Sequence, residues 1–240
     1  MTEGMYGDRA ALYDRIYHWK DYVAEARLLV ERLAAMGVGD GARVLEVACG
    51  TGSFLAELAD RYDVAGLDRE AAMLVEARAK LPDVELIRAD MTEFSVERPF
   101  DALLCLFSSI GYLPDEAALA RALGRFHAAL RPGGVLIVEP WLAPDVYRDG
   151  ISSLQTYEDD DLKLARMSHS GRRNDVSVID FEWLVGRTGR PVERFRERHE
   201  LWLCPRETMR EAMVDAGFDT AFQAEGLGGP VPRGIFVGRR

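Results

Sequence analysis

The chain has 240 residues, of which 48% are hydrophobic and 29% charged, and this balance suits one globular domain or one domain with a large insertion. Its net charge of −10 argues against nucleic acid or an anionic membrane as the main partner, because both require clustered lysine and arginine. Residues 1–10 contain no apolar leader, and no apolar run approaches the ~20 residues that span a bilayer. The three cysteines lack paired spacing, which predicts reduced thiols. We therefore expect a cytoplasmic protein that engages neither membrane nor nucleic acid.

Strand and helix patterns alternate between residues 21 and 139. The sequence predicts a helix over 21–36, with Asp21 as its N-cap and Gly37 as its stop. Strands are expected at 44–48, 64–67, 84–89, 100–107 and 135–139. Helices are expected from about Ser53, over 69–81 and over 114–130, with a turn at 132–134. This alternation predicts a parallel sheet that is covered on both faces by helices.

The hydrophobic period changes after Trp141. Residues 162–170, 176–187 and 193–204 alternate apolar and polar, which is typical of antiparallel strands. A helix over 205–216, stopped by Gly217, and two strands at 219–225 and 234–238 then complete the chain. We therefore predict a core of residues 1–140 and 205–240, with an N-terminal helical lid, and an antiparallel sheet inserted at 141–204.

The most specific motif is a glycine-rich turn between the first strand and its helix, Glu46 to Gly52 (EVACGTG). Gly50 and Gly52 allow a tight turn and a close approach of the backbone to a ligand, because no Cβ intervenes. The next helix offers unpaired N–H groups at the same place. Sixteen residues beyond Gly52, Asp68 ends the second strand, where a carboxylate can accept hydrogen bonds from both hydroxyls of a ribose. The motif predicts a nucleoside-containing cofactor.

Two cofactors fit this motif. A dinucleotide site favours a third glycine, and Leu55 stands at that position instead. The acidic Glu46 favours S-adenosylmethionine (SAM). Asp90 and Met91 end the third strand, where the carboxylate would accept from an adenine amino group and the thioether would pack against the ring. Met73, on the helix after Asp68, lies either over the adenine or in the core.

The blocks VLEVACGTG, GLD, RADM, FDALLCLFSSIGYL and LRPGGVLIVEP, found between residues 44 and 140, resemble the class I SAM-dependent methyltransferases. The resemblance implies a doubly wound, mostly parallel, seven-stranded Rossmann-like α/β sheet with an antiparallel β insertion. Blocks at 13–17, 107–112, 138–141, 166–170 and 233–238 resemble N,N-dimethyltransferases of nucleotide-linked 3-amino-deoxysugars in antibiotic pathways. That implies N-methylation of a small acceptor, a sugar nucleotide, with SAM as donor and S-adenosylhomocysteine as product.

The residue patterns and the resemblance together assign a set of site residues. The expected cofactor contacts are Tyr13, Tyr22, Ala48, Gly50, Gly52, Asp68, Arg69, Met73, Asp90, Met91 and Leu106. The expected acceptor contacts are Tyr17, Ser108, Glu139, Trp141 and Arg233. Arg233 would meet a diphosphate, since a guanidinium suits such oxygens, or is a solvated arginine. The insertion is expected to form the acceptor wall and to offer a homodimer contact.

Two side chains are candidates for catalysis. Tyr112 follows the fourth strand and could orient or deprotonate an amine, or be a loop tyrosine with an exposed hydroxyl. His169 of the insertion could contact sugar or phosphate or act as a base, or be a structural histidine. The N-terminal aromatic residues form either a lid over a sulfonium or a packing cluster, and they are Tyr6, Tyr13, Tyr17, Trp19 and Tyr22. No metal motif is present, and the acidic run 158–161 lacks the spacing of a calcium loop.

Three other functions remain open at this level. O- or C-methylation of a different metabolite would use the same fold and donor. An NAD-dependent oxidoreductase is disfavoured by Leu55 and by the Asp90–Met91 pair. A binding module without turnover is compatible with the fold. The sequence does not assign the acceptor or the number of methyl groups transferred.

Overall fold

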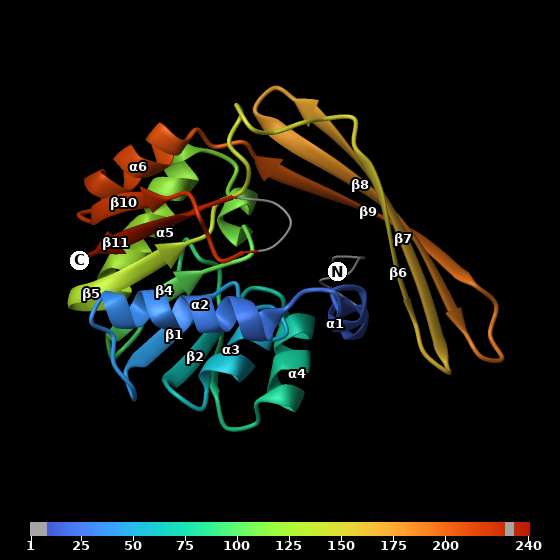
Figure 1. Cartoon of the computed structure of the whole chain (residues 1–240), viewed down its shortest axis with the longest axis horizontal. Coiled ribbons are helices and arrows are strands. Elements are labelled where there is room, and N and C mark those ends of the chain that lie inside the picture. Colours follow the sequence, from blue (N-terminus) through green and yellow to red (C-terminus); the bar gives the residue numbers. More distant parts are fainter. Residues whose placement is uncertain (1–8, 229–232) are drawn as a thin grey trace.

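The computed structural model describes residues 9–228 and 233–240 and contains two separate sheets (Figure 1). The larger sheet contains β1 Arg43–Val47, β2 Asp63–Asp68, β3 Glu85–Arg88, β4 Phe100–Cys105, β5 Leu130–Val138, β10 Asp219–Gln223 and β11 Ile235–Arg239. Its strand order is β10-β11-β5-β4-β1-β2-β3. All described pairings in it are parallel except the two that β11 makes. The predicted doubly wound, mostly parallel sheet of seven strands is confirmed.

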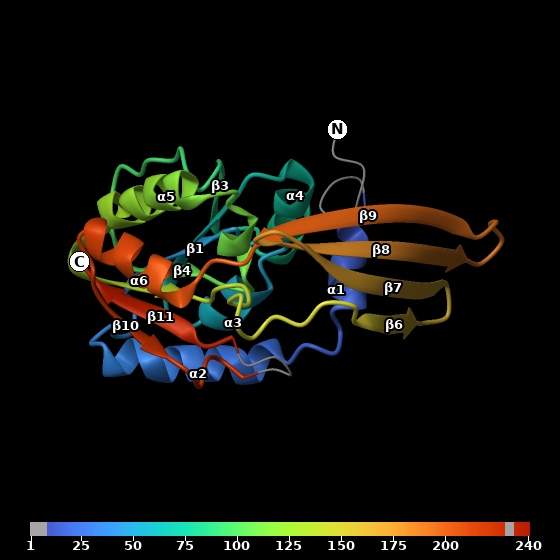
Figure 2. The ribbon, with the colours of Figure 1, turned by 90° about the horizontal axis from the view of Figure 1, so that it is seen from above.

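Helices cover both faces of this sheet (Figure 2). The helices α2 Tyr22–Ala35 and α3 Ser53–Leu58 pack on one face, and α5 Glu116–Ala129 and α6 Arg206–Asp215 pack on the other. In β4, Ala102 and Leu104 face the first pair of helices while Leu103 and Cys105 face the second, which explains why this strand is continuously apolar. Among the described residues, no helix combines the length and the apolar character needed to cross a membrane.

The start of α2 agrees with the sequence pattern. Asp21 is its N-cap, and its Oδ1 accepts a hydrogen bond of 2.9 Å from the backbone N–H of Ala24. Gly37 follows the helix with a φ of 80°, a left-handed conformation that ends helices. The predicted helix boundaries are therefore confirmed to within one residue.

The second sheet is antiparallel, with the order β6-β7-β8-β9. Its strands are β6 Ser152–Glu158, β7 Leu162–Arg173, β8 Val176–Arg187 and β9 Glu193–Trp202. The last three agree with the predicted strands. β6 was not predicted, because its polar and mostly exposed residues give no clear alternation, and its pairing with β7 defines it. β5 also begins earlier than predicted, since residues 131–134 form a bulge between the pairs Phe100–Leu130 and Ala102–Val135.

The N-terminal segment lies between the two sheets (Figure 1). We call residues 9–19 the lid, which contains the 3₁₀ turn η1 Ala10–Leu12 and the short helix α1 Tyr13–Ile16. Its apolar side packs with Met73 of α4 (Ala71–Lys80) and with the fully buried Trp183 of β8. The apolar side chains of the lid therefore pack between the core and the inserted sheet. Tyr6, expected in the aromatic cluster, lies outside the described residues.

Two adjacent charged residues of the lid connect it to the core on one side and to the inserted sheet on the other. Asp14 accepts hydrogen bonds from Thr51 Oγ1 at 2.6 Å and from Lys80 Nζ at 2.9 Å, which connects α1 to the core. Arg15 Nη1 donates to Tyr157 Oη at 2.8 Å, which connects α1 to β6. Because these three bonds arise from two adjacent residues of one helix turn, they fix its position between the sheets.

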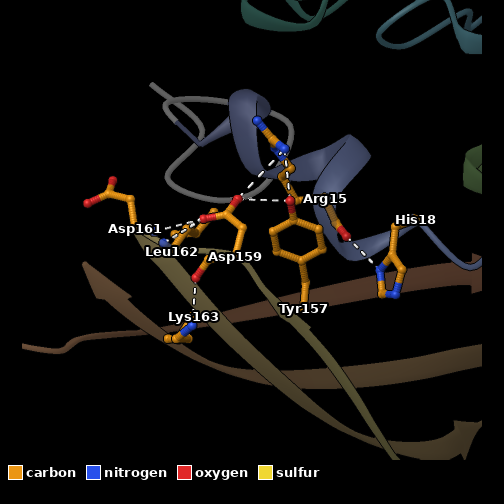
Figure 3. A network of polar contacts seen from close by, with 7 residues as sticks. All are labelled: Arg15, His18, Tyr157, Asp159, Asp161, Leu162 and Lys163. Atoms are coloured by element: carbon orange, nitrogen blue, oxygen red, sulfur yellow. Dashed lines mark hydrogen bonds and ion pairs between the residues drawn. The ribbon is translucent and has the colours of Figure 1, made fainter. Parts of the chain in front are cut away.

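Figure 3 shows the polar contacts that Arg15 makes with the inserted sheet. Tyr157 Oη donates to Asp159 Oδ2 at 2.8 Å, and the Asp159 carboxylate lies 3.8 Å from the guanidinium of Arg15. Asp159 also accepts from the backbone N–H of Leu162, in the turn between β6 and β7. The Leu162 bond, followed by the Tyr157 bond, lowers the pKa of Asp159, so the carboxylate that faces Arg15 is charged near neutral pH.

Replacing Tyr157 with Phe should loosen the lid without unfolding the protein. The change removes the hydroxyl that joins Arg15 to Asp159, while the ring remains. We expect faster amide hydrogen exchange in residues 13–16 with a Tm within about 2–4 °C of wild type, because exposed bonds of this kind contribute about 1 kcal/mol or less. Lys163→Ala is the matched control, since Lys163 Nζ donates to the Asp159 carbonyl in the same turn and pairs with Glu158, and neither contact reaches the lid. Unchanged exchange in Tyr157→Phe would show that apolar packing alone holds the lid.

Candidate active site

A cavity of about 450 Å³ lies between the carboxyl ends of β1 to β4 and the inner face of the inserted sheet. From the core it is lined by Ala48, Gly50, Leu67, Asp68, Arg69, Glu70, Met73, Ala89, Asp90, Met91, Phe107, Ser108, Ser109, Tyr112 and Leu113. Parallel sheets place ligands at this edge, because the carboxyl ends of all their strands meet there. The volume is in the range of small-molecule sites.

The turns that lead into the cavity hold their backbone in an unusual conformation. Ala48 after β1 and the pair Phe107–Ser108 after β4 have φ values of 58°, 50° and 62°, in the left-handed region that non-glycine residues rarely adopt. Such residues cost about 1–3 kcal/mol each and persist only where neighbours fix them. The N–H of Phe107 donates to Glu139 Oε2 at 2.7 Å, and Ser108 Oγ donates to the Pro140 carbonyl at 2.8 Å. The end of β5 therefore fixes the strained turn of β4.

Asp68 presents a carboxylate to the cavity in a fixed orientation. Its Oδ2 accepts from the N–H of Gly50 at 2.8 Å and its Oδ1 accepts from the N–H of Glu70 at 2.9 Å. Each carboxylate oxygen has a further lone pair, so both can still accept a hydroxyl of a ligand. Burial of the side chain raises the pKa of Asp68 despite these two bonds.

Asp90 presents a second carboxylate next to an apolar slot. The N–H and the hydroxyl of Thr92 both donate to Oδ1, at 2.9 and 2.7 Å. Although partial burial acts to raise it, these bonds lower the pKa of Asp90, which keeps the group ionised. Met73 and Met91 line the same cavity. A flat apolar group with a hydrogen-bond donor on its edge fits this corner.

Aromatic rings of the lid close the cavity on another side. The rings of Tyr13 and Tyr17 lie 4.7 Å apart, and the Tyr17 ring meets Phe107 edge to face at 5.2 Å. The guanidinium of Arg166, from β7, lies 4.8 Å from the Tyr17 ring and donates to its hydroxyl at 3.1 Å. Burial raises the pKa of Tyr13 well above its usual value, so its ring is neutral.

Arg233 brings a partly buried cation to the cavity wall. Its Nη1 donates to Glu139 Oε1 at 3.4 Å, and its guanidinium lies 5.4 Å from the ring of Trp141. Its Nε is buried, and it has no hydrogen-bond partner within the described ranges 9–228 and 233–240. A buried donor without a partner is costly, so an anionic group of a ligand would stabilise it.

Known proteins are similar to this chain over nearly its whole length. A family model described as a methyltransferase domain matches residues 44–134. The dTDP-3-amino-3,6-dideoxy-alpha-D-glucopyranose N,N-dimethyltransferase of Streptomyces fradiae is 39% identical over 97% of this chain and 91% of its own length. The dTDP-3-amino-3,4,6-trideoxy-alpha-D-glucopyranose N,N-dimethyltransferase of Streptomyces venezuelae is 36% identical over 96% and 97%. The chain belongs to this family of SAM-dependent methyltransferases.

A solved structure gives the same result. SAM-bound CalS10, an amino pentose methyltransferase from Micromonospora echinaspora involved in calicheamicin biosynthesis, is 34% identical and superposes with a TM-score of 0.85 over all of both chains. The cavity of the present methyltransferase fits SAM on its own geometry. Asp68 offers two oriented acceptors for a ribose, and Asp90 with the two methionines offers a polar and apolar corner for adenine.

The structure brings most of the predicted site residues together. Thirteen line the cavity, namely Tyr13, Tyr17, Ala48, Gly50, Asp68, Arg69, Met73, Asp90, Met91, Ser108, Tyr112, Trp141 and Arg233. Tyr22, Gly52, Leu106, Glu139 and His169 do not line it. Among the described residues no cluster of His, Cys, Asp and Glu that could hold a metal ion is found.

The five others have different places in the fold. Tyr22 contacts Phe54 and lines a neighbouring smaller hollow. Gly52 is the N-cap of α3, where an added Cβ would meet Leu81 at 3.2 Å, so it serves close packing. Leu106 is buried in the core, and Glu139 supports Phe107 and Arg233 from behind the wall.

His169 is on the wrong face of its strand. Successive residues of β7 point to opposite faces, so Ser168 and Ser170 line the cavity while His169 is exposed on the outer face beside Ser152. His169 is thus not brought to the cavity that was expected to use it.

Sequence reasoning missed the inner face of the insertion. Arg166, Phe181 and His199 all line the cavity, from β7, β8 and β9. The period-two pattern could have indicated them, because each falls on the same side as buried positions of its strand. His199 Nδ1 lies 2.5 Å from Tyr112 Oη, across 87 residues of sequence, which no local pattern reports.

Replacing Asp68 with Asn should weaken binding of S-adenosylhomocysteine at least tenfold, or about 1.4 kcal/mol, because an amide cannot accept with both atoms. Calorimetric titration measures this. Asp63→Asn, at the exposed opposite end of β2, is the control and should bind as wild type does. Unchanged affinity in Asp68→Asn would remove Asp68 from the cofactor site.

The raised pKa of Asp68 also predicts a pH dependence. The ligand favours the ionised carboxylate, so affinity should fall as pH drops through the pKa of the free enzyme. Because that pKa lies above the usual value of about 3.9, the loss should begin at a higher pH than for an ordinary aspartate. The same titrations, repeated at a series of pH values, should show this loss of affinity at low pH in wild type and not in Asp68→Asn. A wild-type affinity that is flat down to acid unfolding would contradict the assignment.

Proposed function

We propose that this methyltransferase methylates the amine of a nucleotide-linked 3-amino-deoxysugar, in an antibiotic pathway. One observation carries the proposal: a single cavity is lined both by the oriented carboxylates Asp68 and Asp90 and by the arginines Arg166 and Arg233 of the acceptor side. Donor and anionic acceptor can therefore meet in one chamber. The free thiols Cys49, Cys105 and Cys204 favour a reducing compartment, which supports a cytoplasmic reaction.

The cofactor would be held by side chains from the core and the lid. Asp68 would bind the ribose, Asp90 the adenine amino group, and Met73 and Met91 the faces of the base. When bound, SAM supplies an electrophilic methyl group on a sulfonium, which an amine can displace in line. The electron-rich faces of Tyr13 and Tyr17 suit a neighbouring positive charge.

The acceptor would be held by the insertion and the end of β5. Arg233, with its buried Nε, would bind a phosphate of the nucleotide, and Trp141 and Ser108 would bound the sugar. Tyr112 would orient the amine at the carboxyl end of β4. The enzyme then gains rate mainly by holding nucleophile and methyl group in line, an effect that can supply at most about 7–11 kcal/mol.

The decisive assay supplies SAM with a dTDP-3-amino-deoxysugar or with its 3-hydroxy counterpart. We expect mass spectrometry to detect methyl groups on the amine of the aminosugar. We expect no methylated product from the hydroxylated sugar. Transfer to the hydroxyl alone would make the enzyme an O-methyltransferase. Tight binding of SAM without transfer to either acceptor would favour a binding module.

Arg233→Gln should raise the KM for the sugar nucleotide at least tenfold and leave the affinity for S-adenosylhomocysteine unchanged, because it removes a charge-assisted bond to phosphate. Glutamine retains a donor for Glu139, which limits the loss of stability. Arg172→Gln, an exposed arginine of the insertion paired with Asp175, is the control. An equal loss of cofactor affinity would place Arg233 on the donor side instead.

We further infer that the outer face of the inserted sheet forms a homodimer contact. Leu154, Met167 and Leu184 point to this face and are 60%, 55% and 47% exposed. Exposed apolar side chains grouped on one sheet face are typical of an interface. Sedimentation should show a dimer for wild type and a monomer for Met167→Glu. A monomeric wild type would refute the contact.

A further inference from the structure

A largely buried chain of polar contacts runs from the cavity into the inserted sheet. It begins at Tyr112, in the 3₁₀ turn η2 Ser109–Tyr112, whose side chain lines the cavity. Tyr112 Oη lies 2.5 Å from Nδ1 of His199, and His199 Nε2 lies 3.1 Å from Oε1 of Glu197. The side chains of His199 and Glu197 are only 12% and 10% exposed. These three groups thus form a chain of polar contacts, largely shielded from water, from Tyr112 at the cavity to Glu197 in the inserted sheet.

The partners of Glu197 fix the direction of each bond. Its Oε2 accepts from the indole Nε1 of the fully buried Trp183 at 3.3 Å, and its Oε1 is the oxygen that faces His199 Nε2. An ionised carboxylate can only accept, so His199 carries its proton on Nε2 and offers a lone pair on Nδ1. Tyr112 must then donate to Nδ1. Because the Tyr112 proton is directed at His199, the phenolic oxygen of Tyr112 can only accept a hydrogen bond from a group in the cavity.

The groups that face His199 come from several elements. Tyr112 faces the imidazole from η2 and Glu197 faces it from the same strand. The ring of Phe181 on β8 meets it edge to face at 5.1 Å. Arg166 on β7 is the charged group behind that ring, 4.8 Å from Phe181. Glu197 therefore contacts the imidazole directly, while Arg166 is separated from it by the ring of Phe181.

We propose that Tyr112, His199 and Glu197 form a relay that removes the proton from the ammonium of the acceptor. The inference rests on the proposed function. One N–H bond of the ammonium breaks and leaves its electron pair on nitrogen, while a new O–H bond forms on Tyr112. The original O–H bond of Tyr112 breaks and a new N–H bond forms on His199 Nδ1. Glu197 stabilises the resulting imidazolium, and the neutral amine is ready to attack.

Tyr112 is the residue that contacts the substrate, and His199 and Glu197 act through it. Each methylation of a primary or secondary amine regenerates an ammonium, which must lose a proton before another methyl group can be accepted. The relay would therefore act before every transfer, and the proton would leave to solvent when the product departs.

The relay makes a pH-specific prediction. In His199→Gln, kcat/KM near pH 7 should fall about 10²-fold, the lower range for loss of a general base. The deficit should shrink as the pH rises above the pKa of the amine, because the acceptor then arrives neutral. Affinity for S-adenosylhomocysteine should not change. A deficit of equal size at every pH, or no deficit, would overturn the relay.

Glu197→Gln tests the far end of the path and should show the same loss at neutral pH and the same recovery. Glu200→Gln is the matched control, because Glu200 lies on the outer face of the same strand and pairs there with Arg173. It should keep the wild-type pH profile. A wild-type profile in Glu197→Gln would also overturn the relay.

A second measurement needs no turnover. The chain has four histidines, so ¹⁵N chemical shifts of the imidazoles in unliganded wild type can be assigned, with His199→Gln identifying one set. We expect neutral His199 to carry its proton on Nε2. Protonation on Nδ1 would reverse the chain and overturn the relay, whatever the acceptor is. Failure of wild type to methylate any amine would instead count against the proposed function, so the two failures are distinguishable.

Discussion

The cavity depends on a backbone conformation that ordinary residues avoid. Phe107 and Ser108 adopt left-handed φ values after the end of β4, and they persist because Glu139 and Pro140, just after the neighbouring β5, accept their hydrogen bonds. This turn directs Phe107 toward the lid and begins the segment that carries Tyr112. The same glutamate accepts from Arg233, just before the last strand. One buried carboxylate therefore sets the positions of a cavity wall and of a cation that the wall exposes to ligands.

The lid shows how two sheets without a shared hydrogen-bond ladder can form one site. Apolar side chains of the lid pack between α4 and Trp183, which provides non-directional attraction. The bonds of Asp14 and Arg15 add direction, because they reach the core and the insertion from adjacent positions of one helix turn. A segment of this kind can restrict the entry of ligands while leaving the two sheets structurally separate.

The alternation of residues along the inserted strands divides its functions. Inward positions supply Arg166, Phe181 and His199 to the cavity, and outward positions supply Leu154 and Met167 to the opposite surface. The outer face also carries ion pairs such as Asp180 with Arg198. One layer of four strands thus lines the cavity on one side and exposes apolar and charged side chains on the other, with no residue required to serve both.

The sequence alone determined the parts of this protein that are encoded within single strand–turn–helix units. The glycine turn, Asp68 and Asp90 lie close along the chain to the backbone groups that orient them, so local pattern was sufficient to predict the fold class and the carboxylates that line the cavity. Tertiary structure decided the rest. Local sequence favoured His169 over His199 as a catalytic candidate, yet strand parity directs His169 outward and His199 toward Tyr112, 87 residues away. β6, the bulge in β5 and the exclusion of Tyr22, Gly52 and Leu106 from the cavity likewise depend on pairing and packing between distant segments. Such contacts are set by register and burial, which one stretch of sequence does not contain.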